Sequence, residues 1–208
     1  YNVTVLTTKQ NGNDKLDIKH EVKEKNLTIY YYDCLIRFKG AAWSPGLVFS
    51  ILRKWKKFDI IHLQSSRTLY EIIAWFLNIL IPKKIILTPH ASLMSSWIEN
   101  IGNSTLSKLY NFIAKKTFYK KFIFHYLSID EYNQSGNKKN FVIIPNSLNL
   151  QNQEKTCFNK KAIFIGRIHP QKDIEKMFNW IKANKEWNLD LFGPVDDVNY
   201  HSFLLKRL

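Results

Sequence analysis

Short apolar runs alternate with stretches of helical periodicity along almost the whole chain. The runs are rich in β-branched and aromatic side chains, as expected of strands buried in a sheet. Predicted strands cover residues 3–7, 27–32, 59–63, 84–88, 122–128, 141–145, 162–165 and 189–192. Because predicted strands alternate with predicted helices, the pattern indicates an α/β fold with parallel strands.

The helices predicted between these strands have recognisable starts. Ser44 and Pro45 begin one of them, with serine as the cap and proline at the first helical position. A second covers residues 68–81, and a third begins at Thr105. In the third helix an apolar stripe is predicted to face the core, formed by Leu106, Leu109, Tyr110 and Ile113.

A polar stretch without periodicity, residues 150–159, interrupts the alternation. Such a stretch is typical of a linker. We therefore predict one domain in residues 1–149 and the beginning of a second in residues 160–208.

The second part opens with a strand, a turn and a helix. The run 162–165 predicts a strand buried on both faces, and it ends at Gly166. A helix follows, with apolar positions at Ile174, Met177, Phe178 and Ile181. Such a turn presents backbone N–H groups to an anion, and Arg167 and Lys172 add two charges suited to a diphosphate. From spacing alone an ordinary surface Arg and Lys is the favoured alternative, because the Walker and G-x-G-x-x-G glycines are absent.

The composition adds a strong positive charge, with a formal net charge of +14 over 208 residues. That charge indicates a polyanionic partner, such as nucleic acid, an anionic membrane or a phosphorylated substrate. Cys34 and Cys157 are too few for a disulfide framework or a cysteine-based metal cluster. No apolar run is long enough for a membrane-spanning helix.

Five segments in order resemble glycosyltransferase family 4, the retaining sugar-nucleotide-dependent enzymes with two facing Rossmann-like domains (the GT-B arrangement). They are Trp43-Ser-Pro-Gly-Leu with Phe58-Asp-Ile-Ile-His-Leu, Thr88-Pro-His-Ala-Ser-Leu, Val142-Ile-Ile-Pro-Asn-Ser, Gly166-Arg-Ile-x-x-x-Lys-Asp, and Leu191-Phe-Gly-Pro-Val-Asp-Asp. The resemblance implies a GT-B-like α/β fold. Residues 1–149 would form a nearly complete acceptor-side Rossmann-like domain without its first strand. Residues 160–208 would form the first βαβα part of the donor-binding domain.

The resemblance also implies roles for individual residues. Gly166, Arg167 and Lys172 would hold the donor diphosphate, and His90 would lie beside the transferring sugar. Ala91 stands where the family usually has glycine. His62, inside an apolar strand, is predicted to be a core histidine bonded to a backbone carbonyl, without a catalytic role.

The implied function is transfer of a sugar from a nucleotide-diphosphate donor to a glycan or lipid-linked acceptor in cell-surface polysaccharide synthesis. We expect a cytoplasmic protein, peripheral on the inner face of the membrane. No metal or other cofactor is expected, because basic side chains and helix N–H groups would neutralise the diphosphate. The sequence specifies neither the sugar, the base nor the acceptor.

A basic segment provides a second hypothesis. Helical spacing puts Lys108, Phe112, Lys115 and Tyr119 on one side, a mixture that suits an anionic membrane interface. A solvated lysine face explains the same pattern equally well. A non-catalytic basic domain that binds anionic membrane or nucleic acid is therefore the alternative to an enzyme. Nucleic acid is the less favoured partner, because no RNA-binding motif is present.

Two features of the family are absent from residues 1–208, namely its pair of donor-site glutamates and the glycine-rich loop after its first strand. We therefore expect this segment to be a fragment of a gene product or a decayed remnant. Without those glutamates and a nucleobase pocket the sugar would not be oriented for reaction. The segment by itself is expected to bind a sugar nucleotide weakly and to show no transfer.

Overall fold

The computed structural model describes residues 1–11, 14–38, 41–95, 105–135, 139–147 and 160–207. The chain divides into two compact units, Tyr1–Leu148 (unit 1) and Asn149–Leu208 (unit 2). The predicted linker, residues 150–159, lies outside the described residues. Each unit is described by itself.

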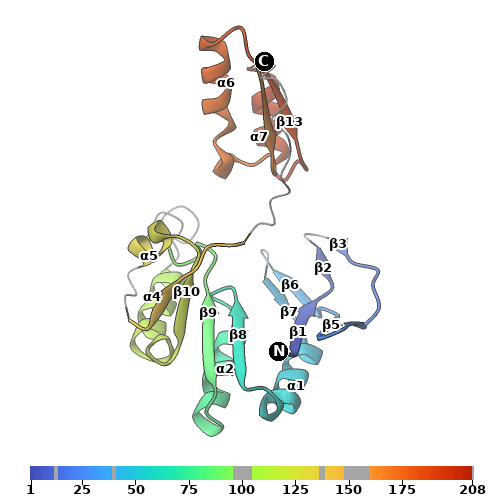
Figure 1. Ribbon diagram of the computed structural model, residues 1–208, viewed down its shortest axis with the longest axis vertical. Coiled ribbons are helices and arrows are strands. Elements are labelled where there is room, and N and C mark those ends of the chain that lie inside the picture. Colours follow the sequence, from blue (N-terminus) through green and yellow to red (C-terminus); the bar gives the residue numbers. More distant parts are fainter. Residues whose placement is uncertain (12–13, 39–40, 96–104, 136–138, 148–159, 208) are drawn as a thin grey trace. The chain divides into compact units, whose positions relative to one another are not determined.

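Unit 1 contains a four-stranded parallel sheet in the order β11-β10-β9-β8. The strands are β8 (Ile60–Gln64), β9 (Lys84–Thr88), β10 (Ile123–Tyr126) and β11 (Phe141–Ile143). Helices α2 (Leu69–Leu80), α4 (Thr105–Lys116) and α5 (Ile129–Ser135) fall between successive strands (Figure 1). The predicted parallel α/β architecture is confirmed, and this sheet is compatible with a Rossmann-like fold.

The remainder of unit 1 precedes this sheet in sequence. A three-stranded sheet pairs β1 (Val3–Thr8) in parallel with β5 (Leu27–Tyr32), and β5 antiparallel with β4 (Glu21–Glu24). Two short hairpins join β2 (Gln10–Asn11) to β3 (Asp14–Lys15), and β6 (Ile36–Phe38) to β7 (Ala41–Trp43). Helix α1 (Pro45–Lys54) follows, and the 3-10 turn η1 (Trp55–Lys57) ends it. The predicted cap is confirmed, since the Ser44 side chain accepts a hydrogen bond from the N–H of Leu47.

The core of unit 1 lies on one face of the parallel sheet. Alternate side chains of β9 and β10 point into it, among them Leu87 and Phe124, which are fully buried. Trp55 closes one side, and its indole N–H donates to the carbonyl of Ile81 at 2.9 Å. Aromatic rings from η2 (Phe118–Lys121) and the strand after it complete the cluster. None of the described helices is both long enough and apolar enough to cross a bilayer.

A buried carboxylate, that of Glu71, joins the start of α2 to this aromatic cluster. One carboxylate oxygen accepts from the N–H of Thr68 at 2.8 Å, so the two residues form a capping box. The other oxygen accepts from the hydroxyls of Tyr119 at 3.0 Å and Tyr110 at 3.3 Å. Glu71 has 0% of its surface exposed. Its carboxylate therefore accepts hydrogen bonds from three separate parts of the unit, namely the start of α2, helix α4 and turn η2.

The predicted membrane-facing surface of Lys108, Phe112, Lys115 and Tyr119 is wrong at Tyr119. Phe112 and Lys115 are exposed, but Tyr119 is only 2% exposed and its hydroxyl faces the core. The side chain of Lys108 lies outside the described part of the chain. Helix α4 ends at Lys116, and the backbone of Thr117 leaves helical conformation at φ −110° and ψ −91°. Helical spacing therefore does not extend to Tyr119.

The stripe predicted to face the core from α4 is also wrong in part. Leu109 and Ile113 are about half exposed, at 52% and 47%. Ala114 is fully buried, and Tyr110 packs against the core beside it. The helix is thus rotated from the predicted orientation, so that the contacts with Glu71 and Phe118 are made.

Unit 1 is expected to lose stability as the pH rises from 4.5 to about 7. Burial raises the pKa of Glu71 from 4.5 to about 7, against the opposing effect of its hydrogen bonds. Between these values the folded chain holds a proton that the unfolded chain has released, so the free energy of unfolding falls by about 3 kcal/mol. Urea unfolding across this pH range would measure the slope. Glu71→Gln is the control, because an amide cannot ionise. An unchanged slope in that variant would contradict the assignment.

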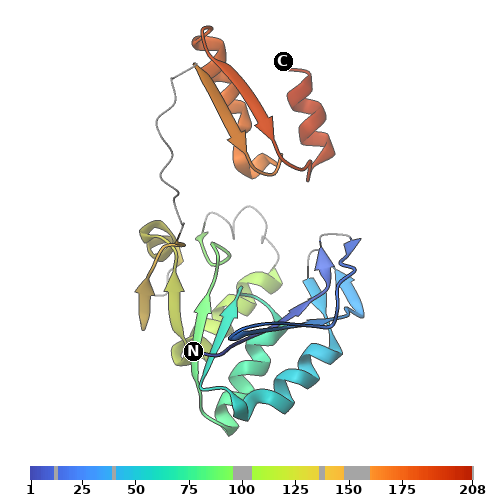
Figure 2. The same ribbon diagram turned by 45° about the vertical axis from the view of Figure 1, so that its right-hand side comes forward.

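Unit 2 is a parallel strand pair covered by helices. Strands β12 (Lys161–Ile165) and β13 (Asn188–Phe192) pair in register from Lys161 with Asn188 to Ile165 with Phe192 (Figure 2). They are joined through the 3-10 turn η3 (Pro170–Lys172) and α6 (Ile174–Ala183). The final helix is α7 (Val198–Leu205). The core comprises Ile168, Ile174, Phe178, Tyr200 and Leu204.

One feature of unit 2 differs from the prediction. Ile163 and Ile165 are 59% and 82% exposed, so β12 is covered on one face and not on both. Phe164, on the opposite face, packs against the core. At the start of α7 the carboxylate of Asp197 accepts from the N–H of Tyr200 at 2.9 Å, so Asp197 caps this helix.

Candidate functional site

Polar side chains gather at the carboxyl end of the parallel sheet in unit 1. Gln64 and Thr88 end neighbouring strands and are paired in register. His90 follows β9 by two residues, and His125 lies on β10. The carboxyl edge of a parallel sheet is where ligands of open α/β folds bind. The predicted position of His90 at a strand end is therefore matched, and further side chains accompany it.

A continuous line of hydrogen bonds connects these side chains. Thr88 Oγ1 lies 2.7 Å from His62 Nε2 and 2.9 Å from His125 Nδ1. Gln64 Nε2 lies 3.2 Å from His62 Nδ1, and 3.1 Å from its Nε2. Gln64 Oε1 lies 2.8 Å from His90 Nε2. Five side chains from three strands and one loop are thus linked one after another by hydrogen bonds.

The donor and acceptor of each hydrogen bond can be assigned by starting from His125, at one end of the line. His125 Nε2 lies 2.9 Å from the carbonyl oxygen of Ile144, and a carbonyl can only accept. His125 is therefore protonated at Nε2, and its Nδ1 accepts from the hydroxyl of Thr88. That hydroxyl has one proton, so it accepts from Nε2–H of His62, whose Nδ1 accepts from the amide of Gln64.

The same logic fixes the tautomer of His90. Gln64 donates through its amide, so its carbonyl oxygen accepts from Nε2–H of His90. In the neutral ring this leaves Nδ1 of the exposed His90 as a hydrogen-bond acceptor. Burial lowers the pKa of His62, and the neighbouring His125 and His90 lower it further. A neutral His62 agrees with the bond directions. His90 can therefore accept a hydrogen bond from a ligand hydroxyl at Nδ1.

A buried carboxylate holds the turn that carries His90. His90 and Ala91 both have left-handed backbone, with φ of 50° and 64°. Glu131, 3% exposed, accepts from the N–H of Ala91 at 2.6 Å and from the N–H of Leu127 at 2.8 Å. Left-handed backbone favours glycine, yet His90 and Ala91 both adopt it here. The bonds to Glu131 stabilise the conformation that alanine adopts less readily.

The predicted surroundings of His62 are wrong. It lies on a strand, but it is not part of the core, and its partners are the side chains of Thr88 and Gln64, not a backbone carbonyl. His125, Thr88 and Gln64 were not predicted as site residues. The signal that could have found them is the pairing of polar residues at the ends of successive parallel strands. Among the described residues, no group of three His, Cys, Asp or Glu side chains could hold a metal ion.

In unit 2 the predicted phosphate-binding residues lie on the connection that follows β12. Gly166 N–H donates to the carbonyl of Phe192, and Ile168 N–H donates to the carbonyl of Pro194, so two turns are bonded side by side. Arg167 is exposed on the first turn, and Lys172 is exposed on η3. Helix α6 starts at Ile174, after the 3-10 turn η3.

Arg167 already has an anionic partner. Its guanidinium lies 2.8 Å from a carboxylate oxygen of Asp196, on the second turn. Both side chains are partly exposed, at 59% and 34%. A phosphate at Arg167 would therefore share or replace this carboxylate. The site residue that sequence reasoning missed here is Asp196, which is 29 residues from Arg167.

Compared with models of known protein families and with curated proteins, the chain gives no match.

Proposed function

We propose that the chain belongs to a glycosyltransferase that resembles family 4. It would transfer a sugar from a nucleotide-diphosphate donor to a glycan or lipid-linked acceptor, in the synthesis of cell-surface polysaccharide. The observation that carries the proposal is the turn after β12. Gly166, Arg167 and Lys172 follow a parallel strand in the order of the family's donor-phosphate loop, and both basic side chains are exposed.

Each residue has a role that its surroundings allow. The guanidinium of Arg167 exchanges the carboxylate of Asp196 for two phosphate oxygens, since arginine binds both anions in the same forked geometry. Lys172 adds a compact charge to the same diphosphate. In unit 1, Nδ1 of His90 accepts a hydrogen bond from a sugar hydroxyl. As negative charge develops on the leaving diphosphate, the two basic side chains stabilise it.

The proposal predicts opposite effects of two substitutions on nucleotide binding. Arg167→Ala is expected to weaken binding of a nucleotide diphosphate about tenfold or more, because a charged hydrogen-bond pair is lost. Asp196→Asn is expected to tighten it about two- to fivefold, because an exposed competing carboxylate is removed. Calorimetric titration with UDP, GDP, UDP-glucose and GDP-mannose, with chelator present, would measure both effects.

The matched control is Asp190→Asn, which removes the same charge from the same unit. Asp190 pairs with Lys161 at 2.7 Å on the neighbouring strand, and its replacement is expected to leave binding unchanged. Binding that requires added Mg²⁺ would contradict the assigned role of Arg167 and Lys172. No binding of any sugar nucleotide would favour the alternative, a basic domain without catalytic activity.

A further inference from the structure

A groove of about 460 Å³ lies between helix α1 and strand β5 in unit 1. Its volume is within the range of small-ligand sites, roughly 300–1,000 Å³. Aromatic side chains line it from one side and basic side chains from the other. They include Tyr30, Tyr32, Phe49, Arg53, Lys54 and Lys57.

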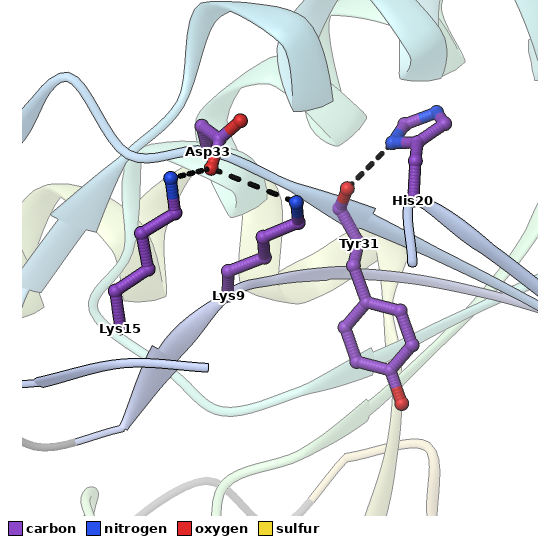
Figure 3. Close-up of polar contacts among 5 residues, drawn as sticks. All are labelled: Lys9, Lys15, His20, Tyr31 and Asp33. Carbon is purple, nitrogen blue, oxygen red and sulfur yellow. Dashed lines mark hydrogen bonds and ion pairs between the residues drawn. The ribbon is translucent and has the colours of Figure 1, made fainter. Parts of the chain in front are cut away.

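The aromatic side of the groove is held in place by hydrogen bonds. The hydroxyl of Tyr32 donates to Oγ of Ser50 on α1 at 2.6 Å, which joins strand to helix across the groove. His20 Nδ1 lies 2.6 Å from the carbonyl oxygen of Tyr31 (Figure 3). The imidazole of His20 meets the Tyr32 ring edge-on, with centroids 5.0 Å apart. These contacts fix the side chains of Tyr32 and His20 on this side of the groove.

The basic side of the groove carries charge that the described residues do not neutralise. Neither Arg53 nor Lys57 makes an ion pair with a described carboxylate. Lys9 and Lys15 differ, because both pair with Asp33, at 3.9 and 2.7 Å (Figure 3). The groove therefore attracts an anion.

Lys54 and Glu21 also contribute to the charge of the groove. Lys54 Nζ lies 3.1 Å from the centre of the Tyr30 ring, and burial lowers the pKa of Lys54. Glu21 is the carboxylate near this pair, and it is bound to Lys23 at 3.1 Å. Hydrogen bonds from Tyr30 and then Lys23 lower the pKa of Glu21. Glu21 thus acts on Lys54, while Arg53 and Lys57 have no described acidic partner, so the charge of the groove remains positive.

Large apolar side chains border the same groove. Phe49, which lines it, is 64% exposed, and Leu52, three residues further along α1, is 50% exposed. Residues three apart on a helix lie on the same side. Exposed Phe and Leu beside Arg and Lys is the combination that enters the boundary between lipid headgroups and acyl chains. A soluble phosphate compound would give these two side chains no burial.

We propose that this groove receives the phosphate headgroup of an anionic phospholipid, with Phe49 and Leu52 inserted beside it. Arg53 and Lys57 bind the phosphate oxygens, and the tyrosine rings pack against the glycerol backbone. This membrane contact is on α1, not on the α4 surface that the sequence suggested. It does not depend on sugar transfer, so either proposal can fail alone.

Vesicle sedimentation with the whole chain tests the proposal. The chain should bind vesicles of phosphatidylcholine with about 30% phosphatidylglycerol, and not phosphatidylcholine alone. Arg53→Ala with Lys57→Ala should weaken binding about 25-fold, since each basic side chain contributes about fivefold at an anionic surface. The matched control is Lys115→Ala with Lys116→Ala, which removes the same charge from exposed positions of α4 and should change binding less than about twofold.

Two further arms complete the test. Phe49→Ser with Leu52→Ser should weaken binding even at high salt, because insertion is not screened. If Arg53→Ala with Lys57→Ala and the control Lys115→Ala with Lys116→Ala weakened vesicle binding equally, the proposal would be overturned. Basic charge anywhere on the surface would then be enough for binding. Displacement from vesicles by glycerol phosphate at constant ionic strength, together with unchanged vesicle binding of the Phe49→Ser, Leu52→Ser variant, would also overturn it, since the groove would then bind a soluble phosphate compound without insertion into lipid. Melting curves that match the wild type would exclude unfolding as the cause of any loss.

Discussion

Replacing Gly193 with alanine is expected to disrupt the turn that presents Arg167. Gly193 has φ of 150°, a conformation that side chains other than glycine rarely adopt. A Cβ built there would lie 1.9 Å from the carbonyl oxygen of Gly166. The contact is with backbone, so no side-chain rotation relieves it. The two turns would have to separate, and unit 2 should lose about 3 kcal/mol or more of stability.

Unit 2 has a convenient reporter for this experiment, the edge-on pair of Trp180 and Trp187 with ring centres 5.4 Å apart. Urea unfolding followed by amide NMR signals of these two residues would measure the loss. Gly166→Ala is the matched comparison. Its added Cβ would meet only the ring of Phe164, at 3.0 Å, and a side chain can move. If Gly193→Ala and Gly166→Ala reduced the stability of unit 2 equally, the contact with the Gly166 carbonyl would not be the cause of the loss.

Glu71→Ala is expected to destabilise unit 1 by about 3 kcal/mol at pH 5, since a helix cap is lost and buried hydroxyls lose their acceptor. At this pH the native carboxyl is protonated, because its pKa is about 7, so no relief of buried charge offsets the loss. The N–H of Thr68 and the hydroxyls of Tyr110 and Tyr119 all lose a partner. Urea unfolding at pH 5 measures the difference.

Two comparisons separate this effect from a general loss of acidic side chains. Asp33→Ala, in the same unit, breaks an exposed ion pair with Lys15 and should cost about 0.5 kcal/mol or less. Glu71→Gln keeps hydrogen-bonding atoms at the same place and should be far less harmful than alanine. If alanine and glutamine proved equally destabilising at pH 5, the loss could not be assigned to the missing hydrogen-bond acceptor.

The sequence predicted the strands of both parallel sheets, because each is a local apolar run bounded by polar residues. It missed β4 (Glu21–Glu24), which has no apolar alternation and is a strand only because β5 pairs with it. The caps at Ser44 and Asp197 were predictable because their partners lie three residues away. The buried orientation of Tyr119 was not, since it depends on a backbone change at Thr117 and on an acceptor 48 residues away.

The site residues also divide into those that local sequence identifies and those whose contacts are distant in sequence. His90, Arg167 and Lys172 belong to short segments whose order along the chain carries the resemblance, so local sequence is enough to single them out. His62 could not be placed in this way, because the pattern of one strand does not show which face of its sheet the helices cover. Asp196 meets Arg167 only because β12 and β13 are neighbours. The periodicity of apolar residues within one strand does not show which residues of adjacent parallel strands are in contact.

The aligned hydrogen bonds from His90 to Ile144 have an electronic consequence. Every donor in the line points away from His90, so each bond polarises the next in the same sense. An imidazolium at His90 would donate more strongly to Gln64, and that change would strengthen the bonds of His62, Thr88 and His125 in turn. The orientation of one exposed ring is thereby set by atoms on three strands, ending at a main-chain oxygen that no substitution can remove.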